Sequence, residues 1–296
     1  MRLGAWGKWV VAGVGAFLAL VLLAVAGNSL AHYRGWSVHR MAPAELSAKL
    51  RPYYRVFRPP GEGRFPTALL YSGCDGPQDN LERWAAMLNA RGWAAIVVDS
   101  HAPRGFSEYD VWRLICAGQM FMGSERAGDV LVSIDDARHM PFVDPDRIAL
   151  VGASHGGWAI MDLLALDPPR RLPFNLSALP DDRDADPLAG VVGTILLYPY
   201  CGSANRAARD GWRRPLPTLF VVSEDDAIAD PDDCLHVVRR LEAHGVPVQT
   251  LILSDVTHGF DQKERAPLST LVFDEGATEA ALGRGASFLD GIRTAR

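Results

Sequence analysis

The segment Gly152-Ala153-Ser154-His155-Gly156 has the residue types and spacing of a serine nucleophile on a tight turn. An apolar run precedes it and a helical pattern follows, which is the strand–turn–helix context that a G-x-S-x-G nucleophile requires. On such a turn the serine backbone is strained, and bulky residues two positions to either side would collide. A glycine-rich turn without chemistry is the alternative. We expect Ser154 to be a nucleophile for acyl transfer, at a helix N-terminus that favours developing negative charge.

A serine hydroxyl is a weak nucleophile at neutral pH, so it needs a histidine base and an acid that orients this base. Asp226 follows one predicted strand, and His258 follows the next. The chain order Ser, acid, His is one in which such triads occur, and ligand sites of open parallel sheets lie at the carboxyl ends of the strands. We expect Ser154, Asp226 and His258 to form a triad, with Asp225 as the alternative acid.

The oxyanion that forms during acyl transfer needs two backbone N–H donors. One should be the amide of His155, the residue after the nucleophile. The other should come from the glycine-containing loop 72–76, with the Cys74 amide as the first choice and the Asp75 amide as the alternative. The His155 side chain is not expected to be the base, because neighbouring side chains on this turn point apart.

The rest of the chain predicts a scaffold that would bring these residues together. Short runs rich in Val, Ile and Leu, apolar on both faces as buried parallel strands are, alternate with helical patterns. This alternation predicts one doubly wound α/β domain with a mostly parallel sheet. His101 follows one of the strands and is expected to line the site. The predicted strands are 67–71, 94–98, 148–152, 191–197, 217–222 and 248–253, and the predicted helices are 80–91, 124–140, 154–166, 232–244 and 278–292.

The N-terminus carries a long apolar segment. Residues 10–26 contain no charge, and Trp9 and Gly27 extend the run. A helix of about 20 residues spans the hydrocarbon core of a bilayer, so 9–27 is long enough for a transmembrane anchor. Arg2 and Lys8 precede the run, so the positive-inside rule predicts a cytoplasmic segment 1–8 and a catalytic domain on the non-cytoplasmic side.

Two other interpretations of this segment stay open. Ala24-Val25-Ala26 fits the cleavage pattern of a signal peptide, although the apolar run is longer than the usual h-region. A secreted protein would then result. A buried core helix is the third interpretation. After this segment, 28–50 is expected to be a linker with a short amphipathic piece, and 51–296 to be the hydrolase domain.

The chain has four cysteines, an even number that permits disulfides in an exported protein. Their spacing lacks the C-x-x-C pattern of zinc or redox sites. Cys201 and Cys234 each follow one of two successive predicted strands, so we expect a bridge between them across the carboxyl edge of the sheet. The alternative is a set of buried free thiols.

From about residue 52 to 292 the chain resembles the dienelactone-hydrolase-like branch of the α/β-hydrolase superfamily. The resemblance implies the triad Ser154, Asp226 and His258, and places Arg104 near the substrate pocket. A structural tie to a loop is the alternative for Arg104. The nucleophile here is serine where dienelactone hydrolases carry cysteine, which argues against a dienelactone as the substrate. The matching pieces are Tyr71-Ser72-Gly73-Cys74-Asp75-Gly76, Asp99-Ser100-His101-Ala102-Pro103-Arg104-Gly105, Val143-Asp144-Pro145-Asp146-Arg147-Ile148, the serine turn, Tyr198-Pro199-Tyr200-Cys201-Gly202 and His258-Gly259-Phe260.

Composition limits the remaining classes of function. A net charge of −5 and a pI of about 5.9 argue against a basic groove for nucleic acid. A hydrophobic fraction of 48% excludes a wholly disordered chain. Asp182-x-Asp184-x-Asp186 begins like a calcium loop, but Pro187 stands where the loop needs glycine, so no metal site is expected.

These observations together predict a serine hydrolase that cleaves a small-molecule carboxylic ester or related acyl bond through an acyl-enzyme. Its only other expected partner is the membrane, through the N-terminal helix, and the mechanism needs no cofactor. A peptidase with the same triad is one alternative. The other is a non-catalytic scaffold of the same fold that binds a ligand or a partner at the membrane.

Overall fold

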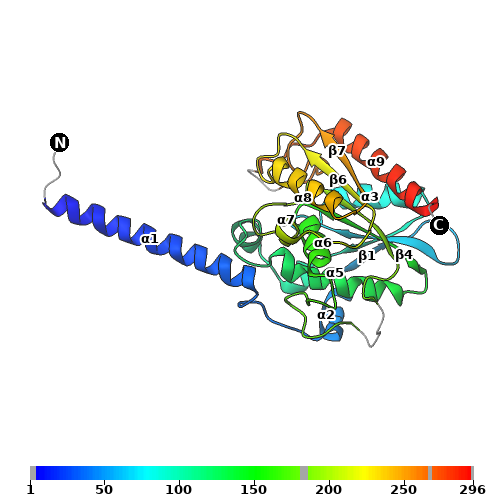
Figure 1. Ribbon diagram of the computed structural model, residues 1–296, viewed down its shortest axis with the longest axis horizontal. Coiled ribbons are helices and arrows are strands. Elements are labelled where there is room, and N and C mark those ends of the chain that lie inside the picture. The colour runs from blue at the N-terminus through cyan, green and yellow to red at the C-terminus, as the bar shows by residue number, and fades with distance from the viewer. Residues whose placement is uncertain (1–4, 181–185, 266–268, 295–296) are drawn as a thin grey trace.

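The computed structural model describes residues 5–180, 186–265 and 269–294, and its centre is a seven-stranded sheet in the order β1-β3-β2-β4-β5-β6-β7 (Figure 1). Strand β1 is antiparallel to β3, and the other neighbouring strands are parallel. The carboxyl ends of six strands therefore meet at one edge. The strands are β1 Tyr54–Phe57, β2 Phe65–Tyr71, β3 Ala94–Val98, β4 Val143–Ala153, β5 Val191–Leu197, β6 Thr218–Ser223 and β7 Val248–Leu253.

Helices cover both faces of the sheet because alternate strand residues are apolar on both sides. Leu69, Leu150 and Phe220 pack into one core cluster with helices α2, α5, α6 and α8. Their neighbours Leu70 and Val151 pack into a second cluster with α3 and α9. The helices are α2 Pro43–Leu50, α3 Asp79–Ala90, α5 Gly123–Arg138, α6 His155–Leu166, α7 Arg206–Asp210, α8 Pro231–Ala243 and α9 Glu275–Thr294.

The predicted fold class is confirmed: this is a doubly wound, mostly parallel α/β sheet. Every predicted strand and helix is present, and 94–98, 191–197 and 248–253 have the predicted bounds. Strand β1 was not predicted. It has four residues and is only partly buried at the sheet edge, so the periodicity that identifies the buried strands is missing.

Segment 28–50 differs from the expected linker. Residues 28–34 continue the first helix, and α2 lies against α5. Met41, Leu46 and Leu50 are buried in the larger core cluster, and Ser47 Oγ donates to Asp136 Oδ1 at 2.6 Å. Leu46 and Leu50 are four positions apart, so one face of a short helix buries both. The packed domain therefore begins near Met41 rather than at residue 51.

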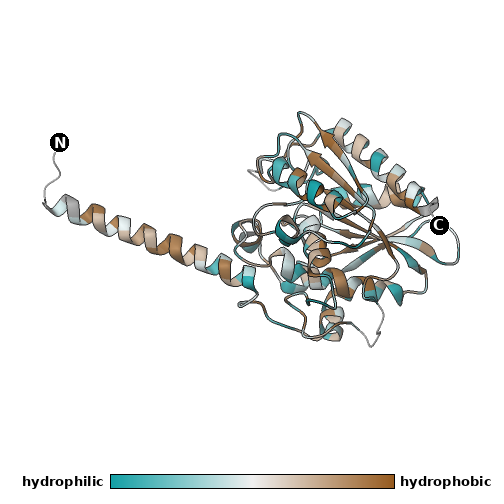
Figure 2. Cartoon of the chain, in the orientation of Figure 1, coloured by the Kyte–Doolittle hydropathy of each residue, from teal (hydrophilic) through white to brown (hydrophobic). Residues whose placement is uncertain are grey.

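Helix α1, Ala5–Arg34, projects away from this domain (Figure 1). The stretch Trp9–Arg34 has 26 residues and a mean hydropathy of 2.6. None of the residues in its most apolar window is buried. The helix is apolar along most of its length (Figure 2). A buried core helix is thus excluded, and the helix is long and apolar enough to cross a membrane. Residues 1–4 of the predicted cytoplasmic segment lie outside the described residues.

If residues 41–50 belong to the core, Leu50→Ala will lower the free energy of unfolding by about 2–5 kcal/mol, because it leaves a cavity under a fully buried side chain. Urea unfolding of the full chain in mild detergent, followed by near-UV circular dichroism, measures this loss. Lys49→Ala, at the exposed neighbouring position, is the matched control and should change stability by less than about 0.5 kcal/mol. Equal effects for the two variants would contradict this packing.

Candidate active site

Ser154 lies on the sharp turn between β4 and α6, with φ 47° and ψ −110°. This backbone conformation is strained for a residue with a side chain, and such strain is concentrated at functional sites. A Cβ at position 156 would lie 2.4 Å from the carbonyl oxygen of Tyr71, and one at 152 would lie 2.6 Å from the Gly156 carbonyl carbon. Only glycine fits at both positions, which is the steric requirement that the sequence pattern predicts.

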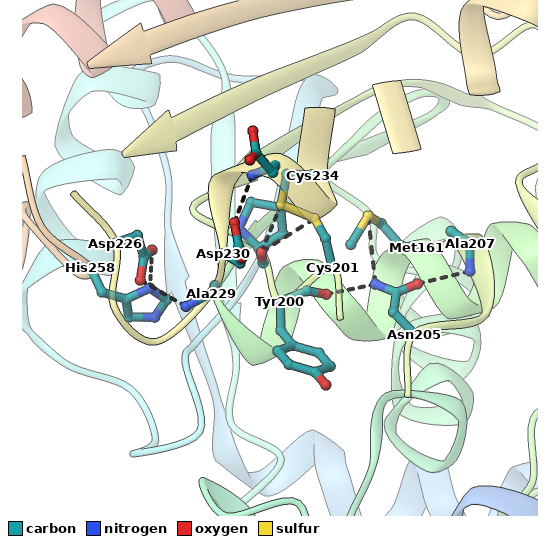
Figure 3. Close-up of a disulfide and its surroundings, with 12 residues drawn as sticks. Met161, Tyr200, Cys201, Asn205, Ala207, Asp226, Ala229, Asp230, Cys234 and His258 are labelled. Atoms are coloured by element: carbon teal, nitrogen blue, oxygen red, sulfur yellow. Dashed lines mark hydrogen bonds and ion pairs between the residues drawn. A yellow bond between two sulfur atoms is a disulfide. The ribbon is translucent and has the colours of Figure 1, made fainter. Parts of the chain in front are cut away.

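Three side chains meet at the carboxyl edge of the sheet. His258 Nε2 lies 2.8 Å from Ser154 Oγ. His258 Nδ1 lies 2.6 Å from Asp226 Oδ2, and Figure 3 shows these two side chains. The other Asp226 oxygen accepts the backbone N–H groups of Ile228 and Ala229, each at 2.8 Å. The Asp226 carboxylate accepts a hydrogen bond from Nδ1–H, which leaves Nε2 without a proton and able to accept the serine proton. The structure thus brings together the three residues that the sequence singled out.

The alternative acid, Asp225, occupies a different position. Its side chain is exposed, whereas Asp226 is buried beside His258. Burial removes competing water, so the Asp226–His258 hydrogen bond holds the imidazole in one orientation. The geometry therefore favours Asp226 as the orienting acid.

The amides expected to bind the oxyanion belong to His155, at the start of α6, and Cys74, in the loop after β2. Both residues line the same cavity as Ser154. Within the described part of the chain, neither amide donates a backbone hydrogen bond outside the regular elements. His155 is the first residue of α6, where a backbone N–H has no acceptor inside the helix. Two N–H donors are thus available close to the serine.

A buried arginine, which no sequence pattern indicated, donates hydrogen bonds to the loop 72–76. Arg126, in α5, donates to the Ser72 carbonyl at 2.8 Å, to Ser72 Oγ at 3.1 Å and to His155 Nδ1 at 3.0 Å. Burial lowers the pKa of Arg126 to about 10, so the guanidinium remains charged at neutral pH. Since Nδ1 accepts a hydrogen bond from Arg126, the His155 imidazole is neutral and carries its proton on Nε2. Its imidazole is directed into the protein and is not placed to act as the base.

The structure corrects the predicted roles of His101 and Arg104, because neither lines the cavity. His101 is buried, and its Nε2 donates to the Cys74 carbonyl at 3.0 Å. Arg104 forms two hydrogen bonds of 2.9 Å with the Asp129 carboxylate and lies over the Phe121 ring. The carboxylate that Arg104 pairs with is therefore the protein's own, and the structural tie is the correct interpretation.

A second buried network lies against His258. The rings of Tyr198 and His258 meet edge to face with their centroids 4.9 Å apart. The Tyr198 hydroxyl donates to Asp261 Oδ1 at 2.5 Å, and Trp84 Nε1 donates to Asp261 Oδ2 at 3.0 Å. Sequence reasoning assigned no role to Asp261, whose partners come from α3 and from the loop after β5. The network holds the Tyr198 ring that packs against His258.

The serine opens into a cavity of about 420 Å³. Asp75 is the only acidic side chain among the described residues that line it. Gln262 Nε2 donates to Asp75 Oδ2 at 2.8 Å, and burial raises the pKa of this carboxyl. Most of the wall is apolar or aromatic, and includes Trp112, Ile115, Met122, Trp158, Tyr200, Ile228 and Leu271.

All four cysteines are paired. Cys201 and Cys234, the pair expected from the sequence, join the loop after β5 to α8, which begins shortly after Asp226 (Figure 3). Cys74 pairs with Cys116, 42 positions away, a pairing for which the sequence offered no signal. This second bridge connects the loop 72–76 to Cys116, directly after the segment Val111–Ile115, of which Trp112 and Ile115 line the cavity. Both bridges therefore tie site loops to neighbouring elements.

Comparison with known proteins agrees with this fold. No family model matches the chain. The acylamino-acid-releasing enzyme of Arabidopsis thaliana is 25% identical over 207 residues, which are 62% of this chain but only 26% of that enzyme's length. Among solved structures, esterase 2 of Thermogutta terrifontis, phosphorylated by paraoxon, has a TM-score of 0.60 at 15% identity, and the match covers 81% of this chain and 88% of that one. A dienelactone hydrolase-like promiscuous phosphotriesterase from metagenomic libraries has a TM-score of 0.54 at 15% identity, over 81% of this chain and 98% of that one.

These likenesses show the α/β-hydrolase fold, so the resemblance noted in the sequence is confirmed at the level of the fold. The chain spans about a quarter of the length of the curated relative.

His101, the buried histidine that donates to the Cys74 carbonyl, should affect how the stability of the protein depends on pH. Burial and the Arg126 charge lower the pKa of His101 to about 3, below its ordinary value of 6.5. The unfolded chain then binds this proton below about pH 6.5 and the folded chain does not, so stability falls as the pH drops towards 3. His101→Gln keeps an N–H donor for the Cys74 carbonyl but removes this proton. Its stability should fall less steeply between pH 6 and 4, by up to about 1.4 kcal/mol per pH unit.

Urea unfolding at several pH values measures both slopes. His39→Gln, at an exposed position, is the control and should follow the wild type. Parallel curves for His101→Gln and the wild type would show that His101 titrates normally in the folded chain.

Proposed function

We propose that this chain, which has the α/β-hydrolase fold, is a serine hydrolase that cleaves a carboxylic ester or a related acyl bond. The observation that carries this proposal is the continuous hydrogen-bonded path from Ser154 Oγ through His258 to Asp226, at the wall of a cavity large enough for a small substrate. A nucleophile, its base and the group that orients the base are the parts that acyl transfer needs. A scaffold that only binds a ligand needs none of them.

The proposed reaction has two halves. Ser154 Oγ attacks the acyl carbon, and its proton passes to His258 Nε2 as the tetrahedral intermediate forms. His258 then gives this proton to the leaving oxygen, so the alcohol departs and the acyl group stays on Ser154. In the second half His258 Nε2 takes a proton from water as the water oxygen attacks the acyl carbon. The bond from this carbon to Ser154 Oγ then breaks, His258 returns the proton to Ser154 Oγ, and the carboxylic acid is released. Asp226 remains ionised throughout and stabilises the imidazolium that forms twice.

The amides of His155 and Cys74 are proposed to hold the oxyanion. One such donor typically contributes about 10²–10³ to the rate, provided that it is already in place. Arg126 and His101 hold the backbone on either side of these donors, through Ser72 and the Cys74 carbonyl. The Arg126 charge also lies behind the oxyanion site, where positive potential favours the intermediate. Preorganisation of this loop is the role that the structure supports for both side chains.

A peptidase is the second candidate. The curated relative is an acylamino-acid-releasing enzyme, and Asp75 supplies one acidic group in the cavity. Against an amine site, Gln262 already occupies one Asp75 oxygen. Turnover of N-acetylalanine p-nitroanilide, compared with p-nitrophenyl acetate, would separate a peptidase from an esterase.

We also propose that α1 anchors the chain in a membrane, with the hydrolase domain on the non-cytoplasmic side. Helix length, hydropathy and the basic residues before the apolar run support the anchor and its direction. The two disulfides support an oxidising compartment. A cleaved signal peptide would export the same domain without an anchor.

A fluorophosphonate probe tests the nucleophile. Such reagents react with activated serines, and the structural neighbour from Thermogutta terrifontis is one that paraoxon phosphorylates. The full chain should carry one adduct, mapped by mass spectrometry to Ser154, and Ser154→Ala should carry none. Ester turnover by this variant should fall by at least about 10³-fold, because the base then has no nucleophile to activate. A well-folded wild type without an adduct would favour the binding scaffold.

Substitution of the two neighbouring aspartates tests the orienting acid. Asp226→Asn should lower kcat by about 10³–10⁴-fold. The amide carries no charge to stabilise the imidazolium, and its NH₂ group can donate to Nδ1, which would put the His258 proton on Nε2 where the serine proton must go. Asp225→Asn is isosteric, adjacent and exposed, and should retain kcat within about twofold. Steady-state kinetics with p-nitrophenyl acetate measures both. A large loss for Asp225→Asn with little change for Asp226→Asn would reverse the assignment.

A further inference from the structure

We propose that the active-site cavity opens at the surface of the membrane and takes its acyl ester from an amphiphile embedded in the bilayer. This inference rests on the proposed serine hydrolase activity and specifies the substrate class of that site. It is carried by the position of the last turns of α1, which hold the domain against the helix beside the cavity.

The end of α1 is docked on the segment that follows Val111–Ile115. Asn28 Nδ2 donates to the Gln119 carbonyl at 2.6 Å, and Gln119 Nε2 donates to Ser29 Oγ at 2.6 Å. Ser29 Oγ also lies 3.4 Å from the Gly118 carbonyl. These bonds join the end of the helix to a segment that lines the cavity, whereas the most apolar window of the helix is not buried.

A second set of contacts fixes the helix one turn later. Arg206 donates to the Tyr33 carbonyl at 2.9 Å, and its guanidinium lies 5.1 Å from the centre of the Tyr33 ring. Arg209 donates to the Tyr33 hydroxyl at 2.7 Å. Arg206 is itself held inside the domain, where its Nε donates to Ser124 Oγ at 2.7 Å. The helix therefore leaves the domain in a defined direction and not from a loose tether.

The cavity lies at the point where the apolar part of α1 ends. Ser29 is one of the cavity-lining residues, and the apolar run ends at Gly27. Two residues of helix rise about 3 Å, so the cavity wall begins within one turn of the apolar stretch. When 9–27 occupies the hydrocarbon core, this wall lies at the depth of the lipid headgroups.

The mouth of the cavity carries exposed apolar side chains suited to that depth. Trp112 and Ile228 line the cavity and remain 37% and 54% exposed. Tyr109, three residues before Trp112, is 67% exposed. Tryptophan and tyrosine favour the membrane–water interface, where an apolar ring and a polar group both find partners. A cavity with an apolar rim and apolar walls accepts an acyl chain that slides out of the bilayer without crossing water.

In this arrangement the ester carbonyl of the amphiphile reaches Ser154 and its acyl chain occupies the cavity. Ser154 Oγ gains the acyl group as the ester C–O bond breaks, and His258 protonates the oxygen of the leaving headgroup alcohol. Water then releases the fatty acid and restores the serine. A water-soluble ester would react as well, but would gain nothing from the anchor.

The test separates the anchor's position from the chemistry. The full chain is reconstituted in vesicles of phosphatidylcholine with phosphatidylglycerol, and hydrolysis is measured for 4-methylumbelliferyl palmitate dissolved in the bilayer and for p-nitrophenyl acetate in water. In the variant, about 12 Gly-Ser residues are inserted between Gly27 and Asn28, which frees the domain to move about 20 Å from the bilayer. The docked residues and the whole cavity remain unchanged. The matched control has the same insertion between Gly61 and Glu62, in an exposed loop.

We expect the insertion after Gly27 to lower hydrolysis of the bilayer-dissolved ester at least tenfold, with p-nitrophenyl acetate within twofold and full fluorophosphonate labelling. The control insertion should change neither rate. Equal hydrolysis of the embedded ester by the variant and the wild type would overturn the inference and leave the hydrolase proposal standing. A purified protein whose N-terminal residue is Gly27 would also overturn the inference, because cleavage after Ala26 removes the anchor. Absence of labelling and of turnover with both esters would instead reject the proposed function.

Discussion

The site depends on one close contact, the approach of the first turn of α6 to the end of β2. Gly156 lies so near the Tyr71 carbonyl that a Cβ there would be 2.4 Å from its oxygen. This approach places Ser154 at the tip of a strained turn and brings the His155 amide next to the loop 72–76. The turn would relax in isolation, because positive φ is unfavourable for serine. The parallel pairing of β2 with β4, from Thr67 and Ile148 to Tyr71 and Gly152, holds it in place.

Beneath that turn the protein buries charge that acts on the reaction only through the backbone. Arg126 and His101 hold the carbonyl groups of Ser72 and Cys74 in the loop 72–76. Burial, and after it the guanidinium charge, lowers the pKa values of His101 and His155, so that both stay neutral beside a fixed positive charge. This network spans α5, α6 and two loops. The disulfide between Cys74 and Cys116 adds a covalent tie to the opposite side of the loop.

Helix α1 is connected to the same loop through one intervening segment. Its end is bonded to the segment after Val111–Ile115, and Cys116 in turn connects this segment to the oxyanion loop. Arg206 holds Tyr33 on the outside and Ser124 on the inside. The end of α1, the cavity wall and the loop that holds Cys74 thus lie along one short chain of contacts. In the proposed membrane setting, the direction of the helix and the direction of the cavity mouth are set together.

The sequence by itself determined the features that local pattern can encode. Alternating apolar runs predicted the parallel strands and their helices, and Ser154, Asp226 and His258 stood out because each follows a strand in the required order. Cys201 and Cys234 stood out for the same reason.

The tertiary structure was needed to distinguish Asp225 from Asp226, since neighbours in the chain lie in different environments and Asp226 alone faces His258. It also revealed that Arg104 pairs with Asp129, that Arg126 underlies the loop, that Cys74 meets Cys116, and that α2 packs as core. Each of these rests on a contact between segments far apart in the chain. Burial and side-chain partners across such distances follow from how the layers pack and leave no periodic trace in the residues themselves.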